Sequence, residues 1–337
     1  MTEPTPDSTG LQAELADKML DLFDSVVDER RAYYTQHADR VPRPEEAPAI
    51  IAKYATLNMG VSGGAGLVPG PWGMAAAIPE LALILRNQLA MVYDIGMAYG
   101  QGAALRRELL AGVLASAVGA GGISLLTTHG GQVLVRQVSL QAFQRVIALL
   151  AGRVTQQLLT SMVSKWLPVV GGAAMAAWSN YSTRRVGEKA VEVLTKEIAY
   201  AAEEVDHLPP ADAQPAPLPA GVDYAVLKLR ALIHLLKVDR QATPAERDYM
   251  QAMIQNAALD DRERAALLAS LDADAKFSID YDLLAGAPDE AVGLLIDMLA
   301  LSRRDQHRHV AEKLYIKQAG RLMGFSDDDL EELLAGE

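Results

Sequence analysis

Residues 61–89 read VSGGAGLVPGPWGMAAAIPELALILRNQL, and their pattern is the most informative in a chain of 337 residues. Glycine, alanine and proline fill the first half, and Glu80 is the only acidic residue of the stretch. Because Gly and Ala lack the side chains that keep helix backbones apart, the stretch favours a closely packed helical core. A buried carboxylate needs a partner. We therefore predict a structural, buried Glu80, for which Arg86, Arg106 or Arg107 could be the partner. A local alternative is a position at the start of a helix, because acids are favoured in the first turn.

The composition favours helices along the whole chain. Half of the residues are hydrophobic but only 5% are aromatic, whereas a β-sandwich is richer in aromatic and β-branched residues. No segment shows the period-2 alternation that is typical of a strand. We predict an all-α protein, in which a Gly/Ala-rich helical bundle is joined by a Pro-rich linker to a small helical domain. Helical periodicity covers about 11–36, 46–60, 73–101, 103–119, 133–165 and 170–205.

A proline-rich segment divides the chain. LPPADAQPAPLPAGV, residues 208–222, contains five prolines and predicts an extended linker. Before it we expect an acidic amphipathic helix within residues 1–45 and a helical domain at 46–207. The second helical domain, 223–337, is predicted to be an internal repeat. Its two copies share the spacing of an Asp, a Glu and a Tyr, which are Asp239, Glu246 and Tyr249 in one copy and Asp305, Glu312 and Tyr315 in the other.

The net charge of −12 is unevenly distributed. Residues 1–52 carry 5 basic and 11 acidic side chains, residues 53–189 carry 11 basic and 4 acidic, and residues 190–337 carry 15 basic and 28 acidic. Basic charge beside apolar surface attracts an anionic membrane; the alternative is a buried domain with ordinary surface arginines. The residues predicted to contact lipid are Trp72, Arg106, Arg107, Arg136 and Trp166, and Arg145 and Arg153 are further candidates.

A membrane-spanning helix is less well supported. Residues 109–126 are uncharged, but eight of them are Gly or Ala and two are Ser, so their drive to enter lipid is weak. The N-terminal MTEPTPDSTG has no apolar signal region, and the chain has no cysteine, which fits a reducing compartment. We expect a cytoplasmic protein that is peripheral at the inner membrane.

Motifs for catalysis are weak. Residues 60–64, GVSGG, fit the G-x-S-x-G pattern of serine hydrolases, but that pattern needs a strand before the serine. The residues before Ser62 are instead predicted to be helical. The glycines also fit no phosphate-binding motif. We predict no catalytic residue, no enzymatic activity and no nucleic-acid partner.

The acidic residues of the second domain allow two interpretations. Thr243, Pro244 and Glu246 fit a helix capping box, which explains Glu246 by itself. Alternatively, acidic side chains could surround Ca²⁺ or Mg²⁺. The loops carry Arg240 and Gln306 in place of further acids or glycine, which disfavours the metal. The candidate metal ligands are Asp239, Glu246, Asp305 and Glu312.

Two segments carry a family resemblance. GGAGLVPGPWGMAAAIPELALILRNQLAMVYDIGMAYG (63–100) and LPVVGGAAMAAWSNYSTRRVGEKA (167–190) resemble the two signature blocks of the EcsC family, so the resemblance covers about 50–205. Glu80 stands where that family more often has Asp. LLKVDRQATPAE (235–246) and RRDQHRHVAE (303–312) resemble loops of the TerB-like fold of tellurite-resistance proteins. Arg240 and Gln306 replace the Gly that this family has after each Asp.

The resemblance implies an all-helical, membrane-associated bacterial protein, and it supplies no reaction. The hypothesis is a non-enzymatic peripheral membrane or lipid-binding protein, whose TerB-like domain serves protein interaction or ion sensing. Its expected partners are phospholipid and, through residues 223–337, a protein. No cofactor is expected apart from a lipid and, on the metal interpretation, Ca²⁺ or Mg²⁺. The alternative is a soluble stress-response scaffold or adaptor without lipid contact.

Overall fold

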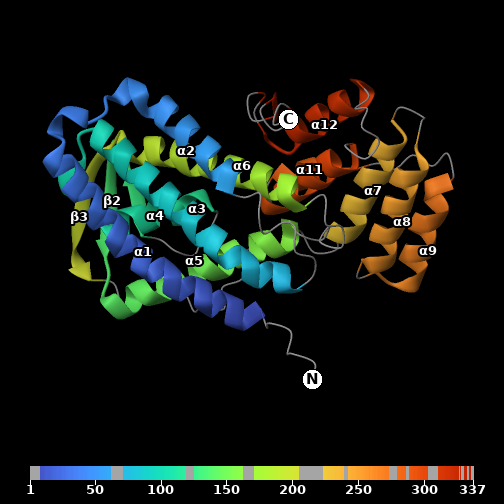
Figure 1. Cartoon of the computed structure of the whole chain (residues 1–337), viewed down its shortest axis with the longest axis horizontal. Helices are drawn as coiled ribbons and strands as arrows, with labels where there is room; N and C mark the ends of the chain where they lie inside the picture. Colours follow the sequence, from blue (N-terminus) through green and yellow to red (C-terminus); the bar gives the residue numbers. More distant parts are fainter. Residues whose placement is uncertain are drawn as a thin grey trace. The chain divides into compact units, whose positions relative to one another are not determined.

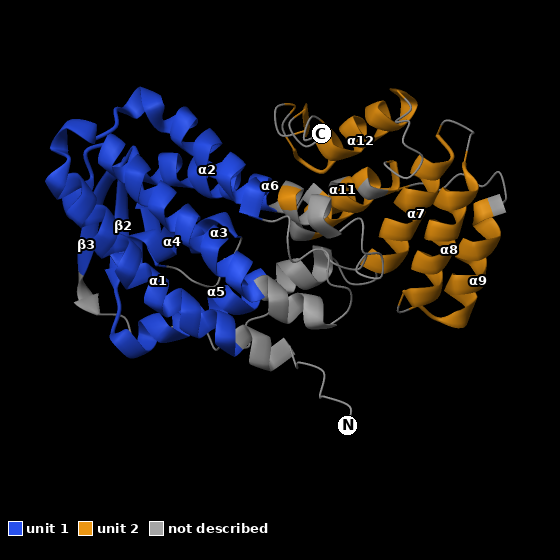
Figure 2. Ribbon diagram, in the orientation of Figure 1, with its two compact units in different colours: residues 1–156, 178–215 blue, residues 157–177, 216–337 orange. Residues whose placement is uncertain are grey.

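The computed structural model divides the chain into two compact units (Figure 2). Unit 1 comprises residues 1–156 and 178–215, and unit 2 comprises residues 157–177 and 216–337. The all-α prediction is confirmed, with one small sheet in addition. The structure describes residues 8–61, 71–118, 125–161, 171–204, 223–238, 242–257, 259–272, 279–285, 288–302 and 310–325, together with 327, 330, 331 and 334.

Unit 1 is organised around one long helix, α3, which contacts α1, α2 and α4 (Figure 1). The acidic N-terminal helix α1 is therefore part of the unit 1 core. Short 3₁₀ turns, η1 (Ala38–Arg40) and η2 (Pro44–Glu46), connect α1 to α2, and η4 (Gly102–Ala104) precedes α4. The helices are α1 (Ser8–Gln36), α2 (Ala47–Val61), α3 (Pro71–Ala98), α4 (Arg107–Ala117), α5 (Leu140–Ser161) and α6 (Gly171–Leu194).

The apolar face of α1 explains why this acidic segment folds onto the others. Leu15, Met19, Phe23, Val26 and Val27 are buried, and their spacing of three and four residues places them on one side of a helix. The Phe23 ring meets the Phe143 ring of α5 edge to face, with 5.7 Å between centroids. The described acids of α1 are exposed, and two of them, Asp24 and Glu29, pair with arginines of the neighbouring helices.

Helices α2 and α6 approach each other closely at a glycine of α6, Gly187. A Cβ atom added at Gly187 would lie 2.6 Å from Cγ1 of the buried Ile51. The glycine-rich first half of the stretch 61–89 falls mainly in residues 62–70, outside the described residues. The packing predicted for that stretch is therefore visible here only at other glycines.

We expect Gly187→Ala to lower the free energy of unfolding by about 1–3 kcal/mol, because overpacking forces side chains and backbone to shift. Gly60→Ala is the control, since a Cβ there meets nothing within 4 Å. In a helix that change is expected to stabilise by about 0.5 kcal/mol. Urea unfolding of the two variants measures both effects, and equal stability of the two would contradict the close contact.

The small sheet corrects the helices predicted at 133–165 and 170–205. Its strands are β1 (Leu126–His129), β2 (Gln132–Gln137) and β3 (Glu197–Glu204) in the order β1-β2-β3, with β1–β2 antiparallel and β2–β3 parallel. Val133 and Val135 are buried and alternate with more exposed neighbours, but six residues are too few for periodicity to be decisive. The Ala- and Glu-rich β3 has weak strand propensity, and its pairing with β2 is a long-range contact.

Unit 2 consists of two similar helix–loop–helix halves. The pairs α7/α8 and α11/α12 each pack together, and α7 also packs against α11. Positions 66 residues apart are buried alike, as for Leu229 and Leu295 or Met250 and Ile316. The matching burial of the two halves agrees with the predicted repeat. The predicted linker 208–222 lies outside the described residues. The helices are α7 (Tyr224–Leu236), α8 (Pro244–Asn256), α9 (Asp261–Asp272), α10 (Asp282–Ala285), α11 (Pro288–Ser302) and α12 (Val310–Leu322).

Candidate functional site

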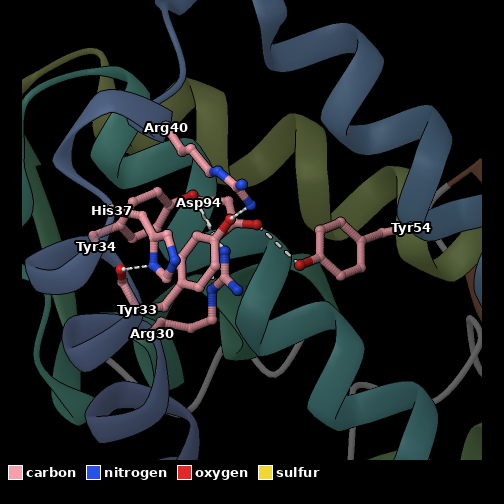
Figure 3. A network of polar contacts seen from close by, with 7 residues as sticks. All are labelled: Arg30, Tyr33, Tyr34, His37, Arg40, Tyr54 and Asp94. Carbon is pink, nitrogen blue, oxygen red and sulfur yellow. Dashed lines mark hydrogen bonds and ion pairs between the residues drawn. The ribbon is translucent and has the colours of Figure 1, made fainter.

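A buried carboxylate lies at the centre of unit 1. Asp94 belongs to the apolar C-terminal part of α3, and it is only 6% exposed. Three side chains from α1 and α2 point toward it (Figure 3). Tyr34 donates a hydrogen bond to Oδ1 over 3.0 Å and Tyr54 donates one to Oδ2 over 2.9 Å. Arg30 donates from Nε to Oδ1 over 2.8 Å and also forms an ion pair through Nη2. Asp94 thus ties α1, α2 and α3 together.

Aromatic rings extend this network toward the surface. The Arg30 guanidinium lies 4.7 Å from the ring centroid of Tyr33 and 5.0 Å from that of Tyr34, which are cation–π distances. The Tyr33 ring stacks on His37, with 4.7 Å between centroids. Arg40 donates to the Tyr33 hydroxyl over 3.5 Å (Figure 3). Arg30 is therefore held on several sides.

The electrostatics of the network favour a fixed ion pair. Burial raises the pKa of Tyr34 and of Tyr54, and the negative charge of Asp94 raises both further, so the two phenols remain donors. Burial by itself would lower the pKa of Arg30, but the charge of Asp94, the hydrogen bond to it and the neighbouring phenols of Tyr54 and Tyr34 together raise it. None of these three groups is poised to exchange a proton near neutral pH. The arrangement is suited to stability rather than to acid–base chemistry.

A second group of buried polar side chains, the amide cluster, joins α2, α3 and α6. Asn87 donates to Asn58 Oδ1 over 2.7 Å, and Asn58 donates to Thr183 Oγ1 over 2.9 Å. Gln88 donates to the same hydroxyl over 3.2 Å, and Thr183 donates to the Ser179 carbonyl over 2.7 Å. Buried amides paired in this way fix the relative positions of the helices.

The prediction of a buried, structural Glu80 stays a prediction. Glu80 is half-buried, and its carboxylate oxygen Oε2 is shielded from solvent. The more deeply buried acid of α3 is Asp94, fourteen residues further along. Of the partners predicted for Glu80, Arg86 forms an ion pair with Glu29. Arg107 forms ion pairs with Glu108 and with Asp24 of α1. A side chain of α3 is buried when it lies on the face that α1 and α2 cover. The local sequence pattern does not reveal which face that is.

The predicted lipid-contacting residues differ in their surroundings. Arg106 is exposed, and its guanidinium lies 4.6 Å from the Tyr200 ring centroid. Arg107 is engaged by acids, as described above, and Arg136 is half-buried in β2. The side chain of Trp72 and the whole of Trp166 are outside the described parts of the chain. The three arginines of the set, which the structure describes, thus differ in exposure and in their partners.

Helix α5 provides an acid-free surface of unit 1. None of its residues, Leu140–Ser161, is Asp or Glu. Leu140 is 56% exposed, and Gln141, Gln144 and Arg145 are exposed beside it. Arg153 is half-buried and donates to the Val118 carbonyl over 3.4 Å. Over residues 140–154, whose side chains the structure describes, the exposed positions of α5 are therefore apolar, neutral or basic.

Unit 2 contains a buried ion pair that the sequence analysis missed. Lys228 of α7 and Asp297 of α11 contact each other with side chains only 2% and 0% exposed. The signal was present as charges inside two apolar runs, Lys228 and Arg230 in LKLRALIHLL and Asp297 alone in LLIDMLAL. Tyr224 lies beside Lys228, and it donates to the Glu290 carbonyl over 2.7 Å. Burial raises the pKa of Tyr224, and the nearby charge of Asp297 adds to this effect.

The predicted capping box of α8 is confirmed. Glu246 is buried and accepts hydrogen bonds from Thr243 N over 2.7 Å and from Thr243 Oγ1 over 2.9 Å. Glu312 is buried at the equivalent place in α12. The other two candidate metal ligands, Asp239 and Asp305, lie outside the described residues. Within the described part, no three His, Asp or Glu side chains are grouped so that they could hold a metal.

The described helices were also compared with the requirements of a membrane span. None of them is long and apolar enough to cross a bilayer.

Comparison with known proteins identifies one of the two units. The fold defines a largely helical protein of two units, in which the second contains two similar helix–loop–helix halves. Residues 226–335 match the family described as "Tellurite resistance protein TerB". The chain therefore carries a TerB domain in unit 2, as the loop resemblance predicted. The EcsC resemblance of residues 50–205 found no family match. No curated protein and no solved structure matched the chain.

Proposed function

We propose that the protein is a non-enzymatic peripheral membrane protein at the cytoplasmic face of the inner membrane. Its EcsC-like region, about 50–205, binds anionic phospholipid, and its TerB domain binds a protein partner. The observation that carries the lipid-binding part is the acid-free exposed face of α5, in a chain of net charge −12. A helix with apolar and basic residues on its exposed side is suited to a membrane interface.

The charge distribution supports α5 as the lipid-binding helix better than it supports α3 or α4. Acids of α1 reach the arginines of α3 and α4, since Glu29 pairs with Arg86 and Asp24 pairs with Arg107. The positive sum of residues 53–189 is thus partly neutralised at those positions. Arg106 and Arg145 are exposed, and they remain the basic residues best placed for lipid head groups.

The second candidate function is a soluble stress-response scaffold. It is favoured by the same ion pairs, because a unit whose arginines are neutralised from within has less attraction to anionic lipid. Under either function, Asp239, Glu246, Asp305 and Glu312 remain the hypothesis for a Ca²⁺ or Mg²⁺ sensor in the TerB domain. Its chemistry would be coordination by carboxylate oxygen.

Flotation with vesicles tests the lipid-binding proposal. The whole chain is expected to float with vesicles that contain phosphatidylglycerol more strongly than with phosphatidylcholine alone. Arg145→Glu changes the local charge by two units, each contributing about 1 kcal/mol near the surface, so binding should fall by about tenfold or more. Leu140→Ser should weaken binding less, and its effect should persist at high salt because salt screens only charges.

Arg43→Glu is the matched control, because it makes the same charge change at an exposed arginine away from α5. It should float like the parent. If the parent floats with neither kind of vesicle and carries no lipid in native mass spectrometry, the scaffold function takes the place of the membrane function.

A further inference from the structure

Helix α12 of the TerB domain exposes two rows of side chains with different chemistry. Val310, Leu314, Gln318 and Leu322 follow one another at intervals of four residues, which forms a ridge on a helix surface. Val310 is 71%, Leu314 63% and Leu322 45% exposed. We call these four residues the apolar ridge. Lys313, Lys317 and Arg321 form the neighbouring ridge at the same interval, the basic ridge. Within α12, all of which the structure describes, the only acid is the buried Glu312.

The internal repeat shows that this apolar ridge is not needed for folding. Sixty-six residues earlier, α8 carries Asp248 at the position of Leu314 and Asn256 at that of Leu322. Both are exposed, and α8 packs within the same domain. The two halves therefore differ on their outer surface while their buried positions correspond. Exposed leucine and valine arranged in one ridge, rather than scattered singly, point to an interaction surface.

The end of the chain shows what kind of segment α12 accepts. Asp327 forms an ion pair with Arg321, and Glu331 forms one with Lys317. Leu330 is buried at α12, where a Cβ atom added at Gly320 would meet it, and Leu334 is also buried. Leu330 and Leu334 are four residues apart, as are Asp327 and Glu331. This segment pairs an apolar ridge with an acidic ridge, which complements α12.

We propose that the exposed face of α12 docks an acidic amphipathic helix of a partner protein. The occupant has leucines at intervals of four residues and acids three residues before or one residue after them, the pattern of Asp327, Leu330, Glu331 and Leu334. Its leucines pack against the apolar ridge and its acids face the basic ridge, chiefly Lys313. This inference deepens the protein-binding role within the proposed function and rests on it, but it does not depend on lipid binding by unit 1.

Two other occupants are less compatible with the charges. A second copy docking α12 against α12 would place two basic ridges together. An anionic membrane would meet a region in which residues 190–337 carry 28 acidic and 15 basic side chains, so its attraction to the basic ridge would be opposed by the rest of the domain. A single acidic helix is small enough to contact the two ridges of α12 without meeting the acidic remainder of the domain.

The test uses the full chain and a fluorescent helical peptide that repeats Asp-x-x-Leu-Glu-x-x-Leu, with Ala and Gln as x. A second peptide has Lys in place of each acid. Fluorescence anisotropy is expected to show binding of the acidic peptide, weaker at high salt, and no binding of the basic one. Leu314→Asp copies the residue that α8 carries at this position, so it preserves the fold, and it should weaken binding by about tenfold or more. Leu57→Asp, at a 48% exposed position on α2, is the control and should bind like the parent.

Three results would overturn the proposal. The first is equal binding of both peptides, or of neither. The second is loss of vesicle flotation, rather than of peptide binding, in Leu314→Asp, which would make α12 a membrane contact. The third is a dimer of the parent in sedimentation that Leu314→Asp dissociates, which would make the occupant a second copy. Failure of flotation in the parent alone would reject only the membrane function.

Discussion

Replacing Lys228 by leucine is expected to lower the free energy of unfolding of the TerB domain by about 3–5 kcal/mol, because it leaves the charge of Asp297 in the core without its lysine counter-charge. Asp297→Ala is expected to have a similar cost, since it leaves a buried ammonium group. Both side chains are almost completely shielded from water. Urea unfolding of the full chain, followed by circular dichroism, measures the change.

The internal repeat predicts a pair of substitutions that restores the lost stability. Positions 66 residues apart correspond, so Lys228 maps onto Leu294 and Asp297 maps onto Ala231, and both of these are 0% exposed. The double variant K228L/D297A therefore reproduces an apolar pair that the domain already buries. Replacing a buried ion pair by packed apolar groups is often neutral or stabilising. We expect the double variant to unfold within about 1 kcal/mol of the parent.

Lys189→Leu is the control for the lysine change, because Lys189 pairs with Glu192 at positions 31% and 54% exposed. An exposed pair contributes about 0–1 kcal/mol. If K228L/D297A is as unstable as the single variants, the ion pair is required by its surroundings and the correspondence between the two halves does not extend to this contact.

The parts of the fold that were predictable are those that depend on local sequence. The apolar face of α1 repeats every three to four residues, and the cap formed by Thr243 and Glu246 is complete within four residues. The strand β3 was not predictable, because its residues alone favour a helix and only the edge of β2, about 65 positions earlier, makes them extended. Pairing with a strand that is distant in sequence decides whether such a segment forms a strand or a helix.

The buried charges were unpredictable for a related reason. Glu80 and Asp94 are both single acids in apolar parts of α3, and the sequence analysis singled out Glu80 but missed Asp94, the more deeply buried of the two. What separates them is the position of Arg30 on α1, 64 residues before Asp94. Lys228 and Asp297 are likewise far apart in sequence. A charge in an apolar run indicates that a partner exists, but the partner is identified only when the helices are placed.

Asp94→Asn is expected to lower the free energy of unfolding by about 2–4 kcal/mol, because hydrogen bonds to charged groups contribute about 1.5–3 kcal/mol each and Arg30 would lose its anion. Tyr54→Phe removes one of these bonds and should cost about 1.5 kcal/mol. Asp28→Asn is the control, since Asp28 and Arg31 form a pair that is 76% and 56% exposed. It should change stability by less than about 0.5 kcal/mol. An equal effect of Asp94→Asn and Asp28→Asn would contradict the role of the network.

The same network predicts how stability responds to alkaline pH. The pKa values of Tyr34 and Tyr54 are raised in the folded protein by burial and by the charge of Asp94, whereas an unfolded tyrosine has a pKa of about 10. The unfolded chain therefore loses these protons first. The stability that the two phenols contribute is fully present below pH of about 10 and is lost as the pH rises above it.

The double variant Tyr34→Phe/Tyr54→Phe separates this effect from that of the other tyrosines. Burial also raises the pKa of Tyr93, Tyr200, Tyr224, Tyr281 and Tyr315, so the parent should lose stability steeply above pH of about 10. Each titrating group contributes up to about 1.4 kcal/mol per pH unit. The double variant should start less stable and then decline more gradually, by up to that amount for each phenol removed. If its decline is as steep as that of the parent, Tyr34 and Tyr54 ionise in the folded state, and the closed arrangement around Asp94 opens at high pH before unit 1 unfolds.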